Sequence, residues 1–485
     1  MRTRDVFLAF VFTIFGVWVY EYTSVGAILL CLIAVGSTYL FTRQQLTVFA
    51  VLIGIILGFS ATALYQNSAN WYYFDNSYLN SKISGIAEIK SAKQTLFGFQ
   101  YVAEIEAKGE ILKVILETND AAELSLEDTT SFAGTLTEPE DFVSEYGITF
   151  HYKNYLRAKG ILYVVKNAKL SDVQKHSGFS MFKILDNIKN KFEMGLERTL
   201  HEPAASLAEG MIVGDKGAMT KADTESFRKS GLIHIIVLSG YNISLVAVFM
   251  LALFRQLGRR ASLVCAAAAI LLFVLMTGAS ATAVRAGIMG VLIIVGNLFH
   301  RKLDILRLLS IAGVAMILFS PLSALYDPSF QLSFLATFGL ISFSPWAARK
   351  LTFITEKWGL REIASATIGS QIMTLPFLAY SMGAVSIVSL FSNILVLPSA
   401  PFLMLFGFLT GFTKLLPVLG GFLYLPFAFI TQAVSSYIFR VSEFFANLPF
   451  SVIATPLAGA IIIFPLYIFL IIYGFQIYQE EKLKR

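Results

Sequence analysis

The chain has 485 residues, of which 56% are hydrophobic and only 14% charged, and its mean hydropathy is +0.68. Soluble domains carry about 25% charged and 45–50% apolar residues. The composition therefore excludes a disordered protein, a disulfide-rich secreted module and an ordinary cytosolic enzyme, and we expect most of the chain to lie in lipid.

The net charge of +6 is unevenly spread along the chain. Residues 66–200 hold 15 basic and 18 acidic residues, a balance of −3, whereas the remainder has a balance of +9. A positive excess is typical of proteins that bind nucleic acid, and also of cytoplasmic loops of membrane proteins. We favour the second interpretation for most of these residues. The two cysteines, Cys31 and Cys265, lie in apolar runs and indicate no disulfide.

Three apolar spans open the chain at about 6–20, 24–41 and 46–65. The first follows Arg2 and Arg4 and is short, as in a signal peptide, but no cleavage site follows it and two more spans come directly after. We interpret residues 1–65 as a domain of N-terminal transmembrane helices.

In residues 66–175 the hydropathy pattern changes, and apolar and polar residues begin to alternate as they do in strands. Five strands are predicted, at 82–90, 99–107, 110–118, 130–138 and 161–170. Five strands in so short a segment are typical of a small antiparallel barrel, of which the OB fold is the commonest kind. Strand number alone does not establish that fold, so we predict an OB-like extracytoplasmic domain.

Aromatic side chains in this insert have two interpretations. They either stack on the bases of a single strand, as in OB folds, or pack in the core or against the membrane. The balance of −3 favours the second, since nucleic-acid binding depends on basic grooves. The side chains concerned are Tyr72, Tyr73, Phe97, Phe99 and Tyr101.

Residues 176–225 form a predicted linker of amphipathic helices. Within 181–214, apolar residues recur at helical spacing with Lys and Glu between them. Such a helix either lies on the membrane surface or caps the barrel, and the pattern does not separate these alternatives.

Residues 226–476 return to apolar spans, predicted at about 232–254, 261–278, 281–299, 305–320, 329–345, 363–382, 385–413, 418–440 and 454–476. If Arg2, Arg4 and Arg43 are cytoplasmic, every later short basic loop also falls inside, as the positive-inside rule requires. This assignment of the loops predicts twelve spans, with both termini, including the tail 477–485, in the cytoplasm. Pro398 and Pro401 make 385–413 a candidate broken or re-entrant pair, giving eleven or thirteen crossings.

Several common functional signatures are absent from the sequence. There is no P-loop, and the five histidines lie at least 25 residues apart, so no metal-ligand cluster is visible. No internal repeat appears either, which makes a transporter built from two matching halves less favoured. We expect no catalytic residues, no metal and no cofactor, and we predict that the chain is not an enzyme.

Four stretches are too polar for plain membrane anchors. They are SFRKSGLIHIIVLSGYNISLV (226–246), LMTGASATAVRAGIMG (275–290), DPSFQLSFLATFGLI (327–341) and QIMTLPFLAYSMGAVSIVSLFSNILVLP (371–398). In this order, with FHYKNYLRAKGI (150–161) and SLAEGMIVGDKGAMT (206–220) upstream, they resemble the ComEC-type competence protein family, the inner-membrane channel for transforming DNA. The resemblance covers about residues 50–440.

The resemblance implies an α-helical polytopic protein of the bacterial cytoplasmic membrane, with about 11–12 transmembrane helices and the inserted barrel. It also implies passage of single-stranded DNA into the cytoplasm. Further implied partners are membrane lipid, a separate DNA receptor, a helicase-type ATPase, a nuclease and a second copy of the chain. The ATPase is needed because the chain has no P-loop, and the nuclease because the family's C-terminal metallo-β-lactamase-like domain is not found.

The sequence departs from the family pattern at two places. Tyr241 and Asn242 replace the usual Leu-His after Ser-Gly. In the stretch 275–290, the family's Ser falls on Ser280 or Thr282. These changes keep hydrogen-bonding capacity but remove an imidazole, which weakens any mechanism that needs a proton carrier there.

Nine residues are candidates for lining the channel or contacting DNA: Arg285, Ser239, Gly240, Tyr241, Asn242, His234, Gln331, Gln371 and Asn393. Arg285 is the strongest, because an intramembrane charge usually faces a partner or a wet cavity. Its alternative role is snorkelling to headgroups or pairing with Asp327 or Glu225. For the others the alternative is ordinary helix packing or interhelical hydrogen bonding, and Asp327 is expected to cap a helix that begins at Pro328.

A channel for single-stranded DNA is the favoured function. A secondary transporter or a polytopic membrane enzyme for a small or lipid-linked substrate is the rival, in which Arg285, His234 and Asp327 would bind an ion or proton. A third alternative keeps the family scaffold without DNA import.

Overall fold

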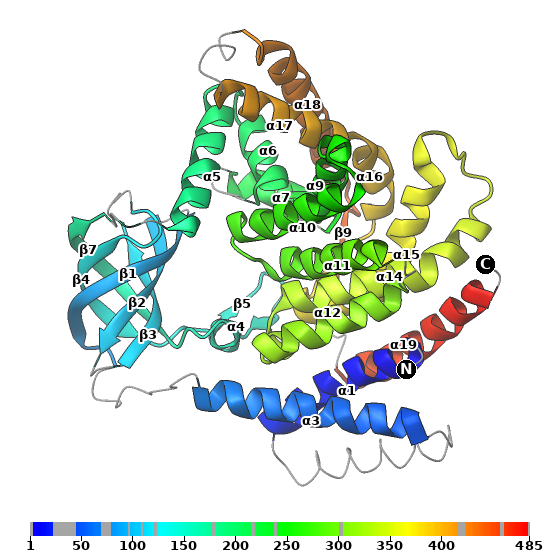
Figure 1. Ribbon diagram of the computed structural model, residues 1–485, viewed down its shortest axis with the longest axis horizontal. Coiled ribbons are helices and arrows are strands. Elements are labelled where there is room, and N and C mark those ends of the chain that lie inside the picture. The colour runs from blue at the N-terminus through cyan, green and yellow to red at the C-terminus, as the bar shows by residue number, and fades with distance from the viewer. Residues whose placement is uncertain are drawn as a thin grey trace. The chain divides into compact units, whose positions relative to one another are not determined.

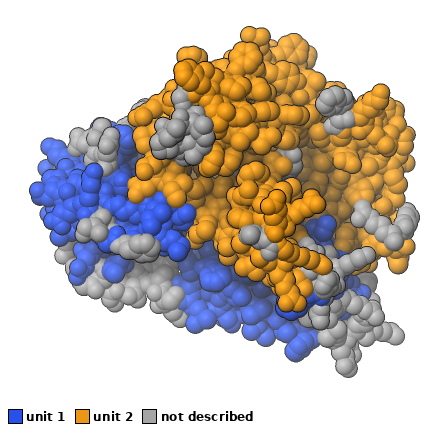
Figure 2. Space-filling view, turned by 45° about the horizontal axis from the view of Figure 1, so that its top comes forward, with its two compact units in different colours: residues 1–142, 151–186, 299–331 blue, residues 143–150, 187–298, 332–485 orange. Residues whose placement is uncertain are grey.

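The computed structural model describes residues 3–22, 45–68, 79–95, 98–107, 110–119, 124–175, 178, 180–214, 219–236, 240–299, 304–415, 422–455 and 460–483. The chain forms two compact units (Figure 2). The first unit comprises residues 1–142, 151–186 and 299–331, and the second comprises 143–150, 187–298 and 332–485.

In the first unit, helices α1 (Thr3–Glu21) and α3 (Gln45–Ser68) pack side by side (Figure 1). Their contact is close because glycines occupy it: a Cβ at Gly58 would lie 2.0 Å from the Thr13 carbonyl oxygen, and one at Gly54 would lie 2.4 Å from that of Ala9. Small residues four apart are typical of tightly packed membrane helices. The predicted helices at 6–20 and 46–65 are confirmed, while the span expected at 24–41 lies outside the described residues.

The first unit also contains a closed five-stranded barrel, with the strand order β1-β2-β3-β7-β4 (Figure 1). Its strands are β1 (Lys82–Thr95), β2 (Gly98–Ala107), β3 (Glu110–Thr118), β4 (Thr129–Thr137) and β7 (Tyr163–Gln174). All five predicted strands are confirmed, because their alternating apolar side chains fill one core.

The expectation of an antiparallel barrel is wrong at one pair. β3 and β7 run parallel, with Val114 opposite Tyr163, whereas the other four pairs are antiparallel. The long connection between them, which contains β4, the short strands β5 (Phe142–Val143) and β6 (Thr149–Phe150), and helix α4 (Tyr152–Ala158), gives the chain room to return in the same direction.

Helix α5 (Met181–Glu197) carries the predicted amphipathic pattern. Its first turn contacts the barrel, because Lys183 Nζ lies 2.9 Å from Oδ1 of the buried Asp128. Near its other end, Phe192 and Leu196 are buried with α6 (Ala204–Ile212). The helical structure predicted within 181–214 consists of two helices, α5 and α6, and the contact with Asp128 agrees with the barrel-capping alternative.

Polar side chains join the remaining helices of the first unit at Glu21, the last residue of α1. Glu21 accepts hydrogen bonds from Arg157 of α4, from Gln66 of α3 at 3.1 Å and from Tyr326 at 3.3 Å. Tyr326 ends α13 (Ser323–Tyr326), which follows α12 (Ile305–Phe319). We call Glu21, Arg157, Gln66 and Tyr326 the Glu21 hub, and it links four helices through one carboxylate.

The second unit is mainly helical. Helices α9 (Gly240–Leu253), α10 (Arg259–Met276) and α11 (Ala281–Leu298) pack on one another around an apolar cluster (Figure 1). Other helices of this unit are α7 (Lys221–Lys229), α8 (Ile233–Ile236), α15 (Leu360–Met382), α18 (Leu425–Ala446) and α19 (Ala460–Leu483). Helix α14 (Pro328–Lys350) belongs to it from residue 332 onward.

The expected span at 385–413 is broken, as its prolines indicate. It begins in strand β8 (Ala384–Ser386), which pairs with β9 (Val452–Ala454), and continues as α16 (Ser389–Val396). A 3₁₀ turn, η4 (Leu397–Ser399), contains Pro398 and precedes α17 (Ala400–Leu415). Proline removes a backbone donor, so the regular helix is interrupted there.

Within the described residues, four helices are long and apolar enough to cross a membrane: Thr3–Glu21, Thr47–Gln66, Arg259–Met276 and Ser389–Lys414. Two shorter apolar helices lie at Ala281–Gly296 and Ile305–Phe319. These helices agree with a membrane protein, and the number of twelve spans stays a prediction.

Candidate functional site

Arg285 lies in the second turn of α11, and a tight turn brings it there. Gly278 and Ala279 have positive φ values of 75° and 49°, which reverses the chain directly after α10. Ser280 then begins α11, since its hydroxyl accepts a hydrogen bond from the Ala283 amide at 3.3 Å. The small residues of this motif therefore serve the turn and the start of the helix, and they place Arg285 between packed helices.

The guanidinium group of Arg285 is buried, with only 8% of the residue exposed. Its Nη1 donates to the Thr337 hydroxyl of α14, which in turn donates to the Ser333 carbonyl oxygen at 2.8 Å. The Phe334 ring lies 6.0 Å from the guanidinium carbon. These contacts orient the group but supply no negative charge.

The charge of Arg285 has no counterion in the part of the chain that the structure describes. No carboxylate there lies within 4.0 Å of it, and its buried Nε has no hydrogen-bond acceptor. A buried charge is costly unless it is paired, and a group with unused donors can bind an anion. The arrangement is therefore suited to a phosphate oxygen.

Gly240, the first residue of α9, lies against this arginine. A Cβ at Gly240 would lie 3.0 Å from Nη2 of Arg285, tighter than ordinary van der Waals contact. The glycine thus leaves space beside the guanidinium group that a larger residue would fill. Arg285 and Gly240 are the two candidate residues that the structure brings together most directly.

The neighbours of Gly240 differ in what the structure shows. Asn242 is buried and its Nδ2 donates to the Met211 carbonyl of α6 at 2.7 Å, so that this amide joins two helices. Ser239 lies outside the described residues, and only the backbone of Tyr241 is described, as part of α9. His234 is exposed, and its Nδ1 lies 3.1 Å from the Gly231 carbonyl oxygen.

Gln371 belongs to a second polar group in this unit, the serine cluster of Ser230, Ser386, Ser389, Ser392 and Ser442. Its Nε2 donates to the Ser389 hydroxyl at 2.6 Å. Ser392 donates to the Ser230 carbonyl at 2.6 Å, and the Ser230 and Ser442 hydroxyl oxygens lie 3.0 Å apart. Buried hydroxyl groups that bond one another in this way are fully explained by helix packing.

Gly231 is required at the centre of the serine cluster. Its φ is +77°, and a Cβ there would lie 2.2 Å from the Ser389 Cβ. Both the backbone conformation and the close approach therefore favour glycine. This explains the first glycine of the stretch 226–246.

Gln331 belongs to the first unit, and Asn393 lies in α16 directly after Ser392 of the serine cluster. Gln331 donates from Nε2 to the carbonyls of Ala324 and Leu325, at 3.1 and 2.7 Å, and so caps the end of α13. Asn393 is buried in α16, and its Oδ1 has no hydrogen-bond donor among the described residues. Among the described candidates of the second unit, Arg285 and Gly240 lie together and Gln371 belongs to the serine cluster.

Asp327 is confirmed as a helix cap. Its Oδ1 accepts a hydrogen bond from the Ser329 amide at 2.9 Å, directly before α14 begins at Pro328. This use of the side chain satisfies one free amide of the first turn.

Sequence reasoning missed Thr337, the residue that holds Arg285. Ser333 and Thr337 are four residues apart in a helix, so they share one face of it. That spacing in an otherwise apolar segment was a signal, although such hydroxyl groups usually bond only their own helix. The buried Ser333 hydroxyl has no partner among the described residues and lies on the same face.

The barrel aromatics divide between the alternatives. Tyr101 is 1% exposed in the barrel core, and Phe99 stacks on it with ring centroids 6.2 Å apart. Both therefore agree with the packing interpretation. Tyr72, Tyr73 and Phe97 lie outside the described residues.

No metal site is visible among the residues that the structure describes, where no three His, Cys, Asp or Glu side chains come together. The absence of a metal and of a cofactor stays a prediction.

Comparison with known proteins gives two matches. A sequence-family model described as competence protein matches residues 211–480, more than half of the chain and all nine candidate positions. ComE operon protein 3 of Bacillus subtilis (strain 168) is 25% identical over 281 residues, which cover 57% of this chain and 35% of that protein. The chain thus spans about a third of the length of that relative. No solved structure matches it significantly.

Proposed function

This chain belongs to the competence protein family, and from that premise we propose that it forms a membrane channel through which single-stranded DNA enters the cytoplasm. The observation that carries the proposal is Arg285, a buried guanidinium group held by Thr337 with no carboxylate within 4.0 Å among the described residues. It is suited to an anion that passes, because an arginine already paired to a carboxylate would have little affinity left for phosphate.

The chemistry of transport supports a single weak site of this kind. A channel must bind its substrate strongly enough to admit it and weakly enough to release it. One buried arginine among hydroxyl groups meets that requirement better than a row of cations, on which a polyanion would stall. In this proposal the chain has no catalytic residue, and a helicase-type ATPase and a nuclease act as separate partners.

The finer features of the protein belong to the same proposal. We place it in the cytoplasmic membrane with about twelve spans and both termini inside, and we assign the barrel to the extracytoplasmic side. Its strand order, in which β7 lies between β3 and β4, supports an OB-like barrel, since it requires a crossing connection of the Greek-key kind.

The rival function, a transporter with a paired acid and arginine, has less support. Asp327 is used as a helix cap, and no acidic residue pairs with Arg285 within the described ranges.

Transformation of a strain that lacks the gene tests the proposal. We expect the deletion to abolish transformation and the uptake of labelled DNA into a nuclease-resistant pool, and the wild-type gene to restore both. Normal transformation in the deletion strain would overturn DNA import as the function. In the deletion strain, which still has the DNA receptor, we expect labelled DNA to bind at the cell surface without entering the cell.

A further inference from the structure

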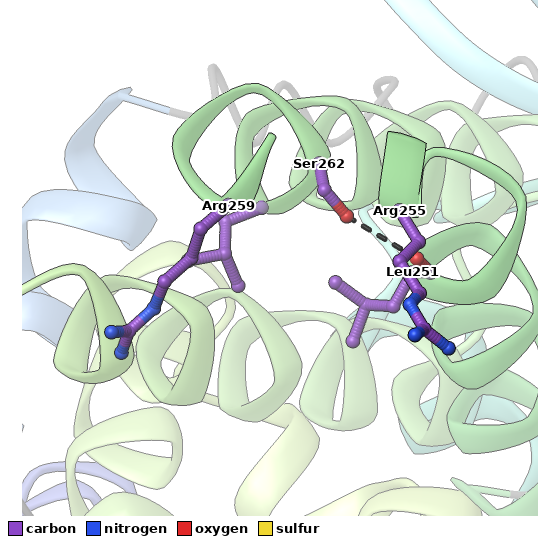
Figure 3. A pocket seen from close by; sticks show the side chains of 5 residues that line it. Leu251, Arg255, Arg259 and Ser262 are labelled. Carbon is purple, nitrogen blue, oxygen red and sulfur yellow. Dashed lines mark hydrogen bonds between the residues drawn. The ribbon is translucent and has the colours of Figure 1, made fainter. Parts of the chain in front are cut away.

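A pocket of about 360 Å³ lies in the second unit where α9 ends and α10 begins. It is lined by Leu251, Arg255, Arg259, Ser262 and Leu263. Figure 3 shows Arg255 and Arg259 on opposite sides of it, with the Leu251 side chain between them. The Ser262 hydroxyl donates to the Leu251 carbonyl at 3.2 Å, which holds the two helices together at this point.

The pocket is strongly basic. Arg255, Arg259 and Arg260 lie within six residues and are all exposed, and the sequence has no Asp or Glu from residue 226 to residue 303. Among the described residues, no carboxylate lies within 4.0 Å of Arg255. Two guanidinium groups on one pocket favour a ligand that is itself an anion.

Backbone amides add to this charge. Helix α10 begins after Gly258, which has no side chain to cap it, and the first turn contains no acidic residue. Gly258 has a φ of +85°, so the turn that exposes these amides depends on glycine. The N–H groups of this first turn and the positive end of the helix dipole therefore add to the basic pocket.

The surroundings of the pocket are apolar, which narrows the class of anion. Leu251 and Leu263 form part of its wall. Helix α10 is one of the four helices long and apolar enough to cross a membrane, and only 28% of that span is buried. Large apolar side chains along it are exposed, including Val264 at 59% and Leu271 at 52%. The arginines thus stand at the end of an exposed apolar helix, where lipid headgroups lie.

We propose that this pocket binds the phosphate group of an anionic phospholipid, with the acyl chains along the exposed face of α10. A phosphodiester that carries two acyl chains matches both the guanidinium groups and the apolar wall, whereas the sugar and bases that follow a DNA phosphate would face leucine. The site is separate from Arg285 and does not depend on the proposed DNA channel. Basic pockets at the ends of membrane helices commonly bind such headgroups.

Native mass spectrometry of the full chain tests this site. The protein is purified in detergent and titrated with phosphatidylglycerol or with phosphatidylcholine, and bound lipid is counted per chain. We expect one saturable phosphatidylglycerol on the wild type, and an affinity that falls about fivefold for each of Arg255→Gln and Arg259→Gln. The matched control is Lys350→Gln with Lys357→Gln, two exposed cations elsewhere in the unit, and it should bind as the wild type does.

Each other outcome has a definite meaning. Equal retention of phosphatidylglycerol by the Arg255→Gln, Arg259→Gln double variant would overturn the site, as would equal loss in the lysine control or equal binding of phosphatidylcholine. Displacement of the lipid by millimolar inorganic phosphate would show a site for free phosphate instead, and displacement by a 20-nucleotide single strand would assign the pocket to DNA. Circular dichroism and gel filtration of both double variants confirm that a lost adduct does not reflect unfolding.

Discussion

Glu21 in the first unit is largely buried and Arg285 in the second is buried, but the surroundings of these two charged side chains are opposite. Glu21 meets Arg157 and two further donors from three other helices. Arg285 meets a threonine hydroxyl and an aromatic ring, with no carboxylate in reach among the described residues. The Glu21 carboxylate is thus paired within the fold, whereas the Arg285 guanidinium group is held in place but keeps an N–H donor without an acceptor among the described residues.

The difference shows how structural and functional charges can be told apart in a membrane protein. In a buried ion pair, the attraction between the two charges offsets the cost of removing them from water. Removing one member leaves the charge of the other uncompensated. A buried charge without a partner destabilises the fold, so its retention points to a ligand. We therefore expect the Glu21 hub to govern stability and Arg285 to govern transport.

The largest expected effect on stability is that of Arg157→Met. It leaves the largely buried Glu21 carboxylate with no cation, which should reduce the free energy of unfolding by about 3–5 kcal/mol. The measurement is thermal unfolding of the purified protein in detergent. The double variant Arg157→Met with Glu21→Gln should recover part of the loss, and a single variant as stable as the wild type would contradict the role of the hub.

A pair of glycine variants should give the next largest effect. Gly58→Ala places a Cβ against a backbone carbonyl of α1, which cannot move away, whereas Gly240→Ala places one against the end of the flexible Arg285 side chain. We expect a loss of about 1–3 kcal/mol for Gly58→Ala and a clearly smaller one for Gly240→Ala. Thermal unfolding of both variants checks this, and the reverse order would disagree with the contrast between the units.

Arg285→Met should change stability by less than about 1 kcal/mol, or increase it, because an apolar residue of similar length removes an uncompensated charge. Membrane abundance and thermal unfolding are the readouts. If the variant unfolds as easily as Arg157→Met, Arg285 is a structural residue and the contrast fails.

The smallest expected effect concerns the barrel domain. Partial burial alone would raise the pKa of Asp141. The hydrogen bonds from His151, at 2.8 Å, and from the Lys153 amide lower the pKa by more than burial raises it, so the net pKa is below the usual value. The ionised form is therefore stabilised in the fold. This contribution is present above the pKa of the unfolded chain, about 3.9, and is lost as the pH falls through the lower pKa of the folded state.

Because Asp141 is partly exposed, the contribution should be below about 1 kcal/mol. Unfolding curves of the wild type and of Asp141→Asn should differ at pH 7 and converge as the pH falls below the folded-state pKa. A difference that grows as the pH falls would contradict the sign of the shift.

Much of the barrel could be predicted from the sequence, because alternation of apolar residues reports directly which side of a strand is buried. The direction of β7 could not, since alternation does not identify a strand's neighbours. The broken helix at Pro398 followed from proline chemistry. The helices within 181–214 were predicted, but not the residues at which α5 ends and α6 begins, because the apolar pattern continues across the break.

The candidate site was predictable in part. Arg285 stood out because a charge in an apolar run is expensive wherever it lies. Gln331 and Asn242 are equally polar in sequence, but they donate to carbonyls of other segments, and such partners depend on tertiary packing. Thr337 was overlooked for the same reason. A polar residue in a membrane helix therefore becomes a site candidate only when its partners are known.

The most direct test of the account compares Arg285→Gln with Arg157→Gln in transformation, each normalised to the amount of folded protein in the membrane. We expect Arg285→Gln to reach wild-type abundance while transformation per molecule falls at least about tenfold, as loss of a charged hydrogen bond to phosphate requires. Arg157→Gln should reduce abundance and leave transformation per molecule close to that of the wild type. Wild-type transformation by Arg285→Gln at normal abundance would contradict the central claim that this unpaired arginine serves the passage of DNA.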